Sequence, residues 1–153
     1  MIGVLQGLKG VTADTVYDLF FTEKKIVAAI VYHPSDMIKM YKPDLLTVFI
    51  GGLPRFEEIK MRSRKMIDER RLTFKNKSID EILAMDKANF ELDYEDIDSV
   101  TIKKSLFSRR LEFRVDKHPL RKIVFSLEKD QVPEVQKLMI TILRDKFIKP
   151  LGR

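Results

Sequence analysis

The sequence predicts an α+β protein that is mainly β: a seven-stranded antiparallel sheet curled into a partly open barrel and capped by a C-terminal helix. Three observations predict this fold. Apolar and polar residues alternate with a period of two through 88–127, a β-rich apolar hairpin occupies 15–33, and a helical period appears in 130–147. One domain of 153 residues, 44% of them apolar, is large enough to bury such a core.

The first three strands are expected near the N-terminus. Residues 2–9 are suited to a strand that Gly7 weakens or bends. Residues 15–33 alternate, turn at 22–24 and continue as an uninterrupted apolar run over 26–32. This pattern predicts a hairpin whose second strand is buried on both faces.

Residues 34–87 have a different character and are predicted to form a helical insertion after the third strand. Residues 54–71 have a narrow apolar stripe on an otherwise charged surface, which is typical of a helix that packs by one face. Ser78 and Glu81 have the spacing of a capping box, so a short helix is expected over 79–87.

Four further strands are expected in 88–127, at a spacing of about ten residues. Val100, Ile102 and Leu106 are assigned to the inward face of one of them, with a connection at 108–109.

A helix is predicted for residues 130–147. Asp130 is expected at its N-cap and Pro133 falls in its first turn, where the missing N–H does little harm. Pro150 is expected to lie beyond its end. The apolar stripe of this helix needs a partner, and the open end of a barrel would provide one.

Two segments resemble those of a known superfamily. Residues 17–26 (YDLFFTEKKI) and 90–100 (FELDYEDIDSV) resemble segments of bacterial and archaeal pleckstrin-homology-like and GRAM-type domains. Seven strands followed by a C-terminal helix is also the order of elements in that superfamily. The resemblance covers 1–33 and 88–147 and leaves 34–87 as an insertion. It implies a barrel that more often serves as an adaptor for lipids, peptides or proteins than as an enzyme.

The resemblance does not extend to phosphoinositide recognition. Some members of the superfamily bind inositol phosphates through a Lys/Arg cluster on the first two strands and the loop between them. Here that stretch offers Lys9, and Asp14 and Asp18 lie beside it in the sequence. No phosphoinositide motif is therefore predicted on these strands.

The sequence contains no recognisable catalytic or metal-binding motif. It has no Cys, which excludes a disulfide scaffold, a zinc finger and a Cys nucleophile. The pair Gly51 and Gly52 lacks the Lys-Ser/Thr partner of a phosphate loop. His33 and His118 each precede Pro, which is typical of turns and strand ends. We therefore expect a protein that is not an enzyme and that uses neither cofactor nor metal.

Charge is distributed unevenly over a chain with 29 basic and 23 acidic residues. Basic residues concentrate in 54–75 and 101–123, and acidic residues in 78–98, which is interpreted as a solvated face. The second basic cluster is suited to the phosphates of nucleic acid or lipid. Base stacking is disfavoured because Phe113 and Phe125 are expected to point inward.

The insertion also concentrates methionines and other apolar residues, which indicates either a small satellite core or an exposed patch. The leading hypothesis is a binding module whose insertion contacts a protein partner, a second copy of the chain or an anionic membrane. The alternative is nucleic-acid binding through the basic face. The candidate binding residues are Phe49, Met61, Arg62, Arg64 and Lys65 in the insertion, and Lys103, Lys104, Arg109 and Arg110 on the basic face.

The sequence shows neither a signal peptide nor a membrane-spanning apolar run. The expected location is the cytoplasm, with peripheral membrane attachment through 45–67 as an alternative. Abundant Lys, Arg and Glu without Cys is a composition typical of thermophiles.

Overall fold

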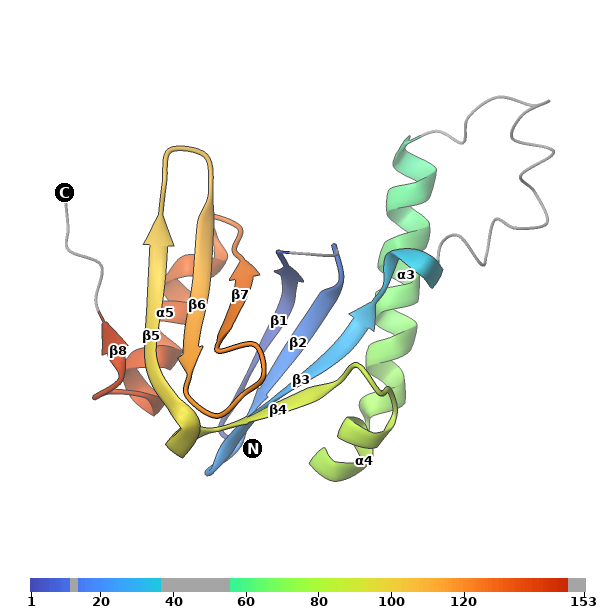
Figure 1. The fold of residues 1–153 in the computed structure, drawn as a ribbon. Helices are drawn as coiled ribbons and strands as arrows, with labels where there is room; N and C mark the ends of the chain where they lie inside the picture. The colour runs from blue at the N-terminus through green and yellow to red at the C-terminus, as the bar shows by residue number, and fades with distance from the viewer. Residues whose placement is uncertain (12–13, 37–55, 149–153) are drawn as a thin grey trace.

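The computed structural model describes residues 1–11, 14–36 and 56–148, and shows one curved sheet with helices on two sides (Figure 1). The sheet has eight strands in the order β4-β3-β2-β1-β7-β6-β5-β8. The strands are β1 (Gly3–Gly10), β2 (Val16–Phe21), β3 (Lys25–Tyr32), β4 (Phe90–Asp93), β5 (Ile97–Lys104), β6 (Arg109–Val115), β7 (Lys122–Ser126) and β8 (Phe147–Ile148). The helices whose bounds lie within the described residues are α3 (Phe56–Phe74), α4 (Ile79–Ala84), the single 3₁₀ turn η1 (Tyr94–Asp96) and α5 (Gln131–Ile142).

The mainly β, α+β class is confirmed, and so are the strands predicted on either side of 34–87. β3 is buried on both faces from Ile26 to Val31, as the continuous apolar run predicts. In β6, Leu111 and Phe113 are fully buried, whereas Arg110 and Arg114 are exposed. The period of two therefore identifies the inward side of the second half of the sheet.

The expected seven-stranded, partly open antiparallel barrel differs from the observed sheet in two respects. The sheet has an eighth strand, β8, which pairs parallel to β5 through Val100 and Phe147. It is also not closed, because β4 and β8 lie at opposite ends of the strand order. The extra strand begins at Phe147, the last residue that the sequence assigned to the C-terminal helix.

Asp130 is the N-cap residue of α5, as predicted, but the capping hydrogen bond and the C-terminal end of the helix differ from the prediction. The helix ends at Ile142, and Leu143 leaves the helical region with φ −117 and ψ 42. Asp130 makes no side-chain cap; instead, the Oε1 atom of Gln131 accepts a hydrogen bond from the Glu128 N–H at 2.8 Å. Ending the helix early places Phe147 beside β5, where its side chain is buried in the core.

The buried residues form two cores on opposite faces of β2 and β3. The larger core combines side chains from all eight strands with the apolar face of α5. The smaller core lies between the outer face of β2 and β3 and the helices α3 and α4. In it, the rings of Phe20 and Phe74 meet edge to face at 5.8 Å. Figure 1 shows α3 and α5 on opposite sides of the sheet.

A buried ion pair also connects α3 to the sheet. The Asp18 carboxylate is 1% exposed and accepts two hydrogen bonds from Arg71, at 2.7 and 2.9 Å. It accepts a third, at 2.9 Å, from the N–H of Gly7. Gly7 has φ +72, within a register shift of β1 between Leu5 and Leu8, and a residue with a Cβ would be strained there. One carboxylate thus connects a bulge, β2 and α3.

Two further side chains tie the connections to the sheet. Asn89 is buried, accepts a hydrogen bond from the Ile30 N–H and donates one to the Ile82 carbonyl, both at 2.8 Å. The hydroxyl of Tyr94 donates to the carbonyl of Thr22 at 2.7 Å, and burial raises the pKa of Tyr94 to about 12. The bond from Ile30 to Asn89 continues the pairing of β3 beyond the N-terminal end of β4.

Candidate binding surface at the β5–β6 hairpin

The connection between β5 and β6 consists of residues 105–108, and Leu106 and Phe107 are the two central residues of its turn. The N–H of Ser105 donates to the carbonyl of Ser108 at 2.8 Å, and the Ser108 N–H donates to the Ser105 Oγ at 3.1 Å. The two hydroxyls also lie 2.8 Å apart. Four hydrogen bonds between Ser105 and Ser108 therefore fix the turn.

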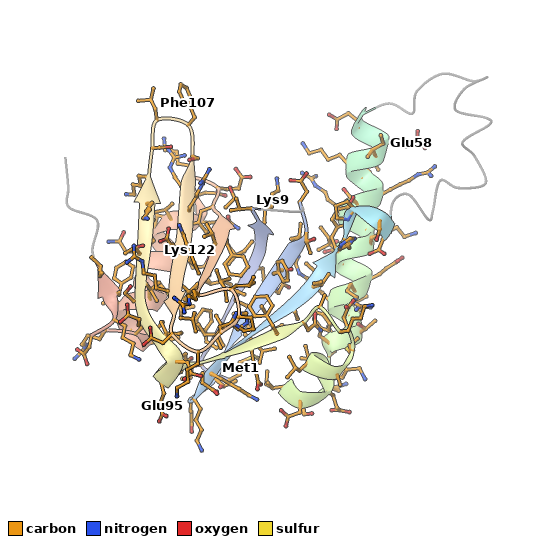
Figure 2. The ribbon with its side chains drawn as sticks, viewed as in Figure 1. Met1, Lys9, Glu58, Glu95, Phe107 and Lys122 are labelled. Carbon is orange, nitrogen blue, oxygen red and sulfur yellow. The ribbon has the colours of Figure 1, made fainter. Side chains whose placement is uncertain are left out.

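The side chains of this turn are the most exposed large apolar groups among the described residues. Leu106 is 86% exposed and Phe107 is 91% exposed. Figure 2 shows Phe107 at the far end of the hairpin, directed away from the sheet. The expectation that Leu106 faces inward with Val100 and Ile102 is therefore wrong, because β5 ends at Lys104 and the turn begins earlier than the apolar pattern suggested.

Cations oppose cations on the two strands that lead to this turn. Lys104 pairs with Arg109 in the register of the hairpin, and Lys103 pairs with Arg110. Successive side chains of a strand point to opposite faces, so each face of the hairpin carries one pair of like charges. Like charges directly opposite each other destabilise a sheet. No acidic residue occurs within 103–110 to offset them.

The next outward side chain along β6 is a buried carboxylate. Glu112 is 3% exposed and lies within ion-pair distance of Lys103 (3.0 Å), Lys122 (3.2 Å) and Arg114 (3.7 Å). Burial acts to raise the pKa of Glu112, but the hydrogen bonds and charges of Lys103 and Lys122 outweigh it and leave the pKa below its usual value. Glu112 thus pairs with cations from three neighbouring strands, β5, β6 and β7.

Three of the four candidate cations on this hairpin remain available to a partner. Lys103 is engaged by Glu112, whereas Lys104, Arg109 and Arg110 form no ion pair within the described part of the chain. We use the name hairpin cluster for the two apolar side chains of the turn and the four cations of the strands: Lys103, Lys104, Leu106, Phe107, Arg109 and Arg110.

The candidate residues of the 34–87 segment are not brought to this cluster. Met61, Arg62, Arg64 and Lys65 lie on α3, at the other side of the sheet, and their side chains are exposed (Figure 1). Arg62 pairs with Glu58 at 2.7 Å and Lys65 lies 3.9 Å from Glu69, so this helix surface carries both signs of charge. Phe49 lies outside the described residues.

The acidic residues of 78–98 are distributed over several ion pairs. Glu91 lies 2.6 Å from Lys25, and Asp96 lies 3.1 Å from Lys117.

Within the described ranges, no three His, Cys, Asp or Glu side chains are close enough to hold a metal ion. Over the same ranges, no helix combines the length and apolarity needed to cross a bilayer.

The hairpin cluster therefore combines an exposed apolar end with cations on both faces. Its four cations are among the binding residues predicted from the sequence, whereas its two apolar residues are not. The sequence contains a signal for this turn, because Ser105 and Ser108 flank two residues and Ser favours turns.

Comparison with known proteins finds no relative: the chain matches no family model, no curated protein and no solved structure.

Proposed function

We propose that this protein is a non-enzymatic binding module that docks on an anionic surface through the hairpin cluster and the neighbouring basic face of β5, β6 and β7. The observation that carries the proposal is that the hairpin register places like charges opposite each other twice, Lys103 opposite Arg110 and Lys104 opposite Arg109. Folding alone does not favour either contact. A negatively charged partner would turn both into favourable interactions.

The magnitude of such an interaction is sufficient for docking. Each Lys or Arg near an anionic membrane contributes about 1 kcal/mol, so the three unpaired cations would contribute about 3 kcal/mol. This contribution falls as salt screens the charges. Strong dependence on ionic strength is therefore the expected signature of the interaction.

Kinship to pleckstrin-homology-like domains is part of the proposal. The strand order, in which β1 lies between β2 and β7, and a C-terminal helix packed on the core both support it. The proposed surface differs from the inositol-phosphate site of that superfamily. On the first strand, Lys9 lies 3.7 Å from Glu128, which neutralises it in part.

The hairpin is a better candidate than either of the other surfaces considered from the sequence. The charges of α3 are of both signs and partly paired, so they attract an anionic partner less strongly. Stacking of nucleic-acid bases on the sheet is disfavoured because Phe113 and Phe125 are buried in the core.

The test is retention on immobilised heparin, eluted with a salt gradient. The variant Lys104→Glu/Arg109→Glu/Arg110→Glu reverses the three unpaired cations and leaves Lys103 to neutralise Glu112. We expect the unchanged protein to be retained and this variant to elute at much lower salt, with an unchanged circular dichroism spectrum.

A matched control makes the same change of net charge on α3 and just after it. Lys60, Arg64 and Lys75 are exposed and form no ion pair among the described residues. Their replacement by Glu should reduce retention less than replacement at the hairpin. Equal elution of the two triple variants would overturn the proposal, since retention would then depend on net charge and not on this surface.

A further inference from the structure

We propose that the anionic surface is a lipid bilayer, and that Leu106 and Phe107 insert into its interfacial region while the cations of the hairpin cluster contact lipid phosphates. This inference rests on the proposed function and assigns its partner. The cations alone would attract any polyanion. The apolar end of the hairpin distinguishes a bilayer from the others.

The choice of residues at the turn is unfavourable for folding. Two-residue hairpin turns favour Asn, Asp or Gly, because the preferred turn types need positive φ. Among the described non-glycine residues positive φ occurs at Asp14, Asn76 and Arg121, so Leu106 and Phe107 both have negative φ. The turn depends instead on the hydroxyls of Ser105 and Ser108. Neither apolar side chain stabilises the fold, because both are exposed to water.

The turn and the cations lie at depths that match a membrane interface. A strand rises about 3.3 Å per residue, so Lys104 and Arg109 are about 7 Å behind the turn residues and Lys103 and Arg110 about 10 Å behind them. Apolar groups of peripheral proteins enter the headgroup and acyl boundary by about 5–10 Å. When the turn is inserted to this depth, the long cationic side chains reach the phosphates.

The distribution of charge around the hairpin also favours a bilayer. One like-charge pair lies on each face, and the apolar turn projects between them, beyond the ends of β7 and β1 (Figure 1). A nucleic-acid duplex would meet one face and leave Leu106 and Phe107 in water. A fluid bilayer surrounds an inserted turn on all sides, so it would contact both pairs and cover both apolar side chains together.

The experiment is sedimentation of the full chain with phosphatidylcholine vesicles, with and without phosphatidylserine. We expect binding to the phosphatidylserine vesicles. Replacing both apolar residues, Leu106→Ser/Phe107→Ser, should weaken the affinity for these vesicles about 100-fold. This factor corresponds to the free energy gained when two large apolar side chains are partly buried, which the variant loses. Retention on heparin should be unchanged, because all four cations remain.

The matched control replaces two exposed apolar residues elsewhere. Leu72 is on α3, and Leu120 is in the β6–β7 connection, at the opposite end of β6 from the turn. The variant Leu72→Ser/Leu120→Ser should bind vesicles as the unchanged protein does.

A spectroscopic probe reports insertion directly. The chain contains no Trp, so Phe107→Trp introduces a single fluorophore at the turn. Its emission should shift to shorter wavelength when phosphatidylserine vesicles are added, whereas that of Leu120→Trp should not. A Phe107→Trp emission that stays unshifted on vesicle-bound protein would contradict insertion.

The outcomes separate this inference from the function on which it rests. Absence of retention on heparin would overturn the proposed function and the inference together. Retention on heparin without vesicle binding would overturn the inference alone, and binding of duplex DNA in that case would identify the partner as nucleic acid. Vesicle binding that survives Leu106→Ser/Phe107→Ser would also overturn the inference.

Discussion

Removing Arg71 should destabilise the protein by about 2–3 kcal/mol, because its guanidinium is the cation that compensates the buried Asp18 carboxylate. Asp18 is 1% exposed and would keep the single hydrogen bond from the Gly7 N–H at 2.9 Å. Breaking a fully buried pair costs about 3–5 kcal/mol. The Arg71 side chain is 27% exposed, so water can reach the vacated position and reduce the cost.

The assay is urea denaturation of Arg71→Ala followed by far-ultraviolet circular dichroism. Adding Asp18→Asn to this variant removes the uncompensated charge and should recover about 1 kcal/mol. Arg70→Ala is the control, since Arg70 lies 3.5 Å from Asp86 in a partly exposed pair and should cost at most about 1 kcal/mol. Two results would refute this prediction. One is a smaller loss of stability for Arg71→Ala than for Arg70→Ala, and the other is no gain in stability when Asp18→Asn is added to Arg71→Ala.

Two other predictions concern the connections of the sheet. Asn89→Ala leaves the Ile30 N–H and the Ile82 carbonyl without their partner and should lower the free energy of unfolding by about 2–4 kcal/mol; a urea midpoint within error of the unchanged protein would contradict this. Tyr94 has a folded pKa of about 12, above its usual value of 10, so the stability it contributes is complete below pH 10 and is lost as the pH rises toward 12. The stability difference between the unchanged protein and Tyr94→Phe should therefore shrink over this range, and a difference that stays constant would show that Tyr94 titrates normally.

The sequence predicted the strands well because their side chains alternate over long enough runs to determine which face is inward. It did not predict the end of α5, because Leu143 and Phe147 continue an apolar helical stripe and are also suited to a strand. Pairing with β5 decides between these structures, and that pairing joins residues far apart in the chain. Local periodicity does not contain this information.

The candidate site was predicted in part for a similar reason. The four cations of the hairpin cluster are recognisable from composition. Leu106 was misassigned because an apolar residue in a turn extends the apparent alternation of β5. The burial of Glu112 was also missed, because an outward position on a strand is normally exposed. Here Lys103, Arg114 and Lys122 cover it, and Lys103 and Lys122 reach it through the pairing of β6 with β5 and β7.

The contact between β1 and β7 affects how the sheet as a whole can deform. These strands share two register pairs, whereas β1 with β2 and β6 with β7 have five each. Farther along β1, Leu138 of α5 approaches Gly3 so closely that a Cβ there would lie 2.9 Å from it. A change in the angle between the two halves would break few backbone hydrogen bonds and would instead shear this helix contact. We therefore expect the angle between the two halves of the sheet to depend on the packing of α5 against β1 as well as on the hydrogen bonds between β1 and β7.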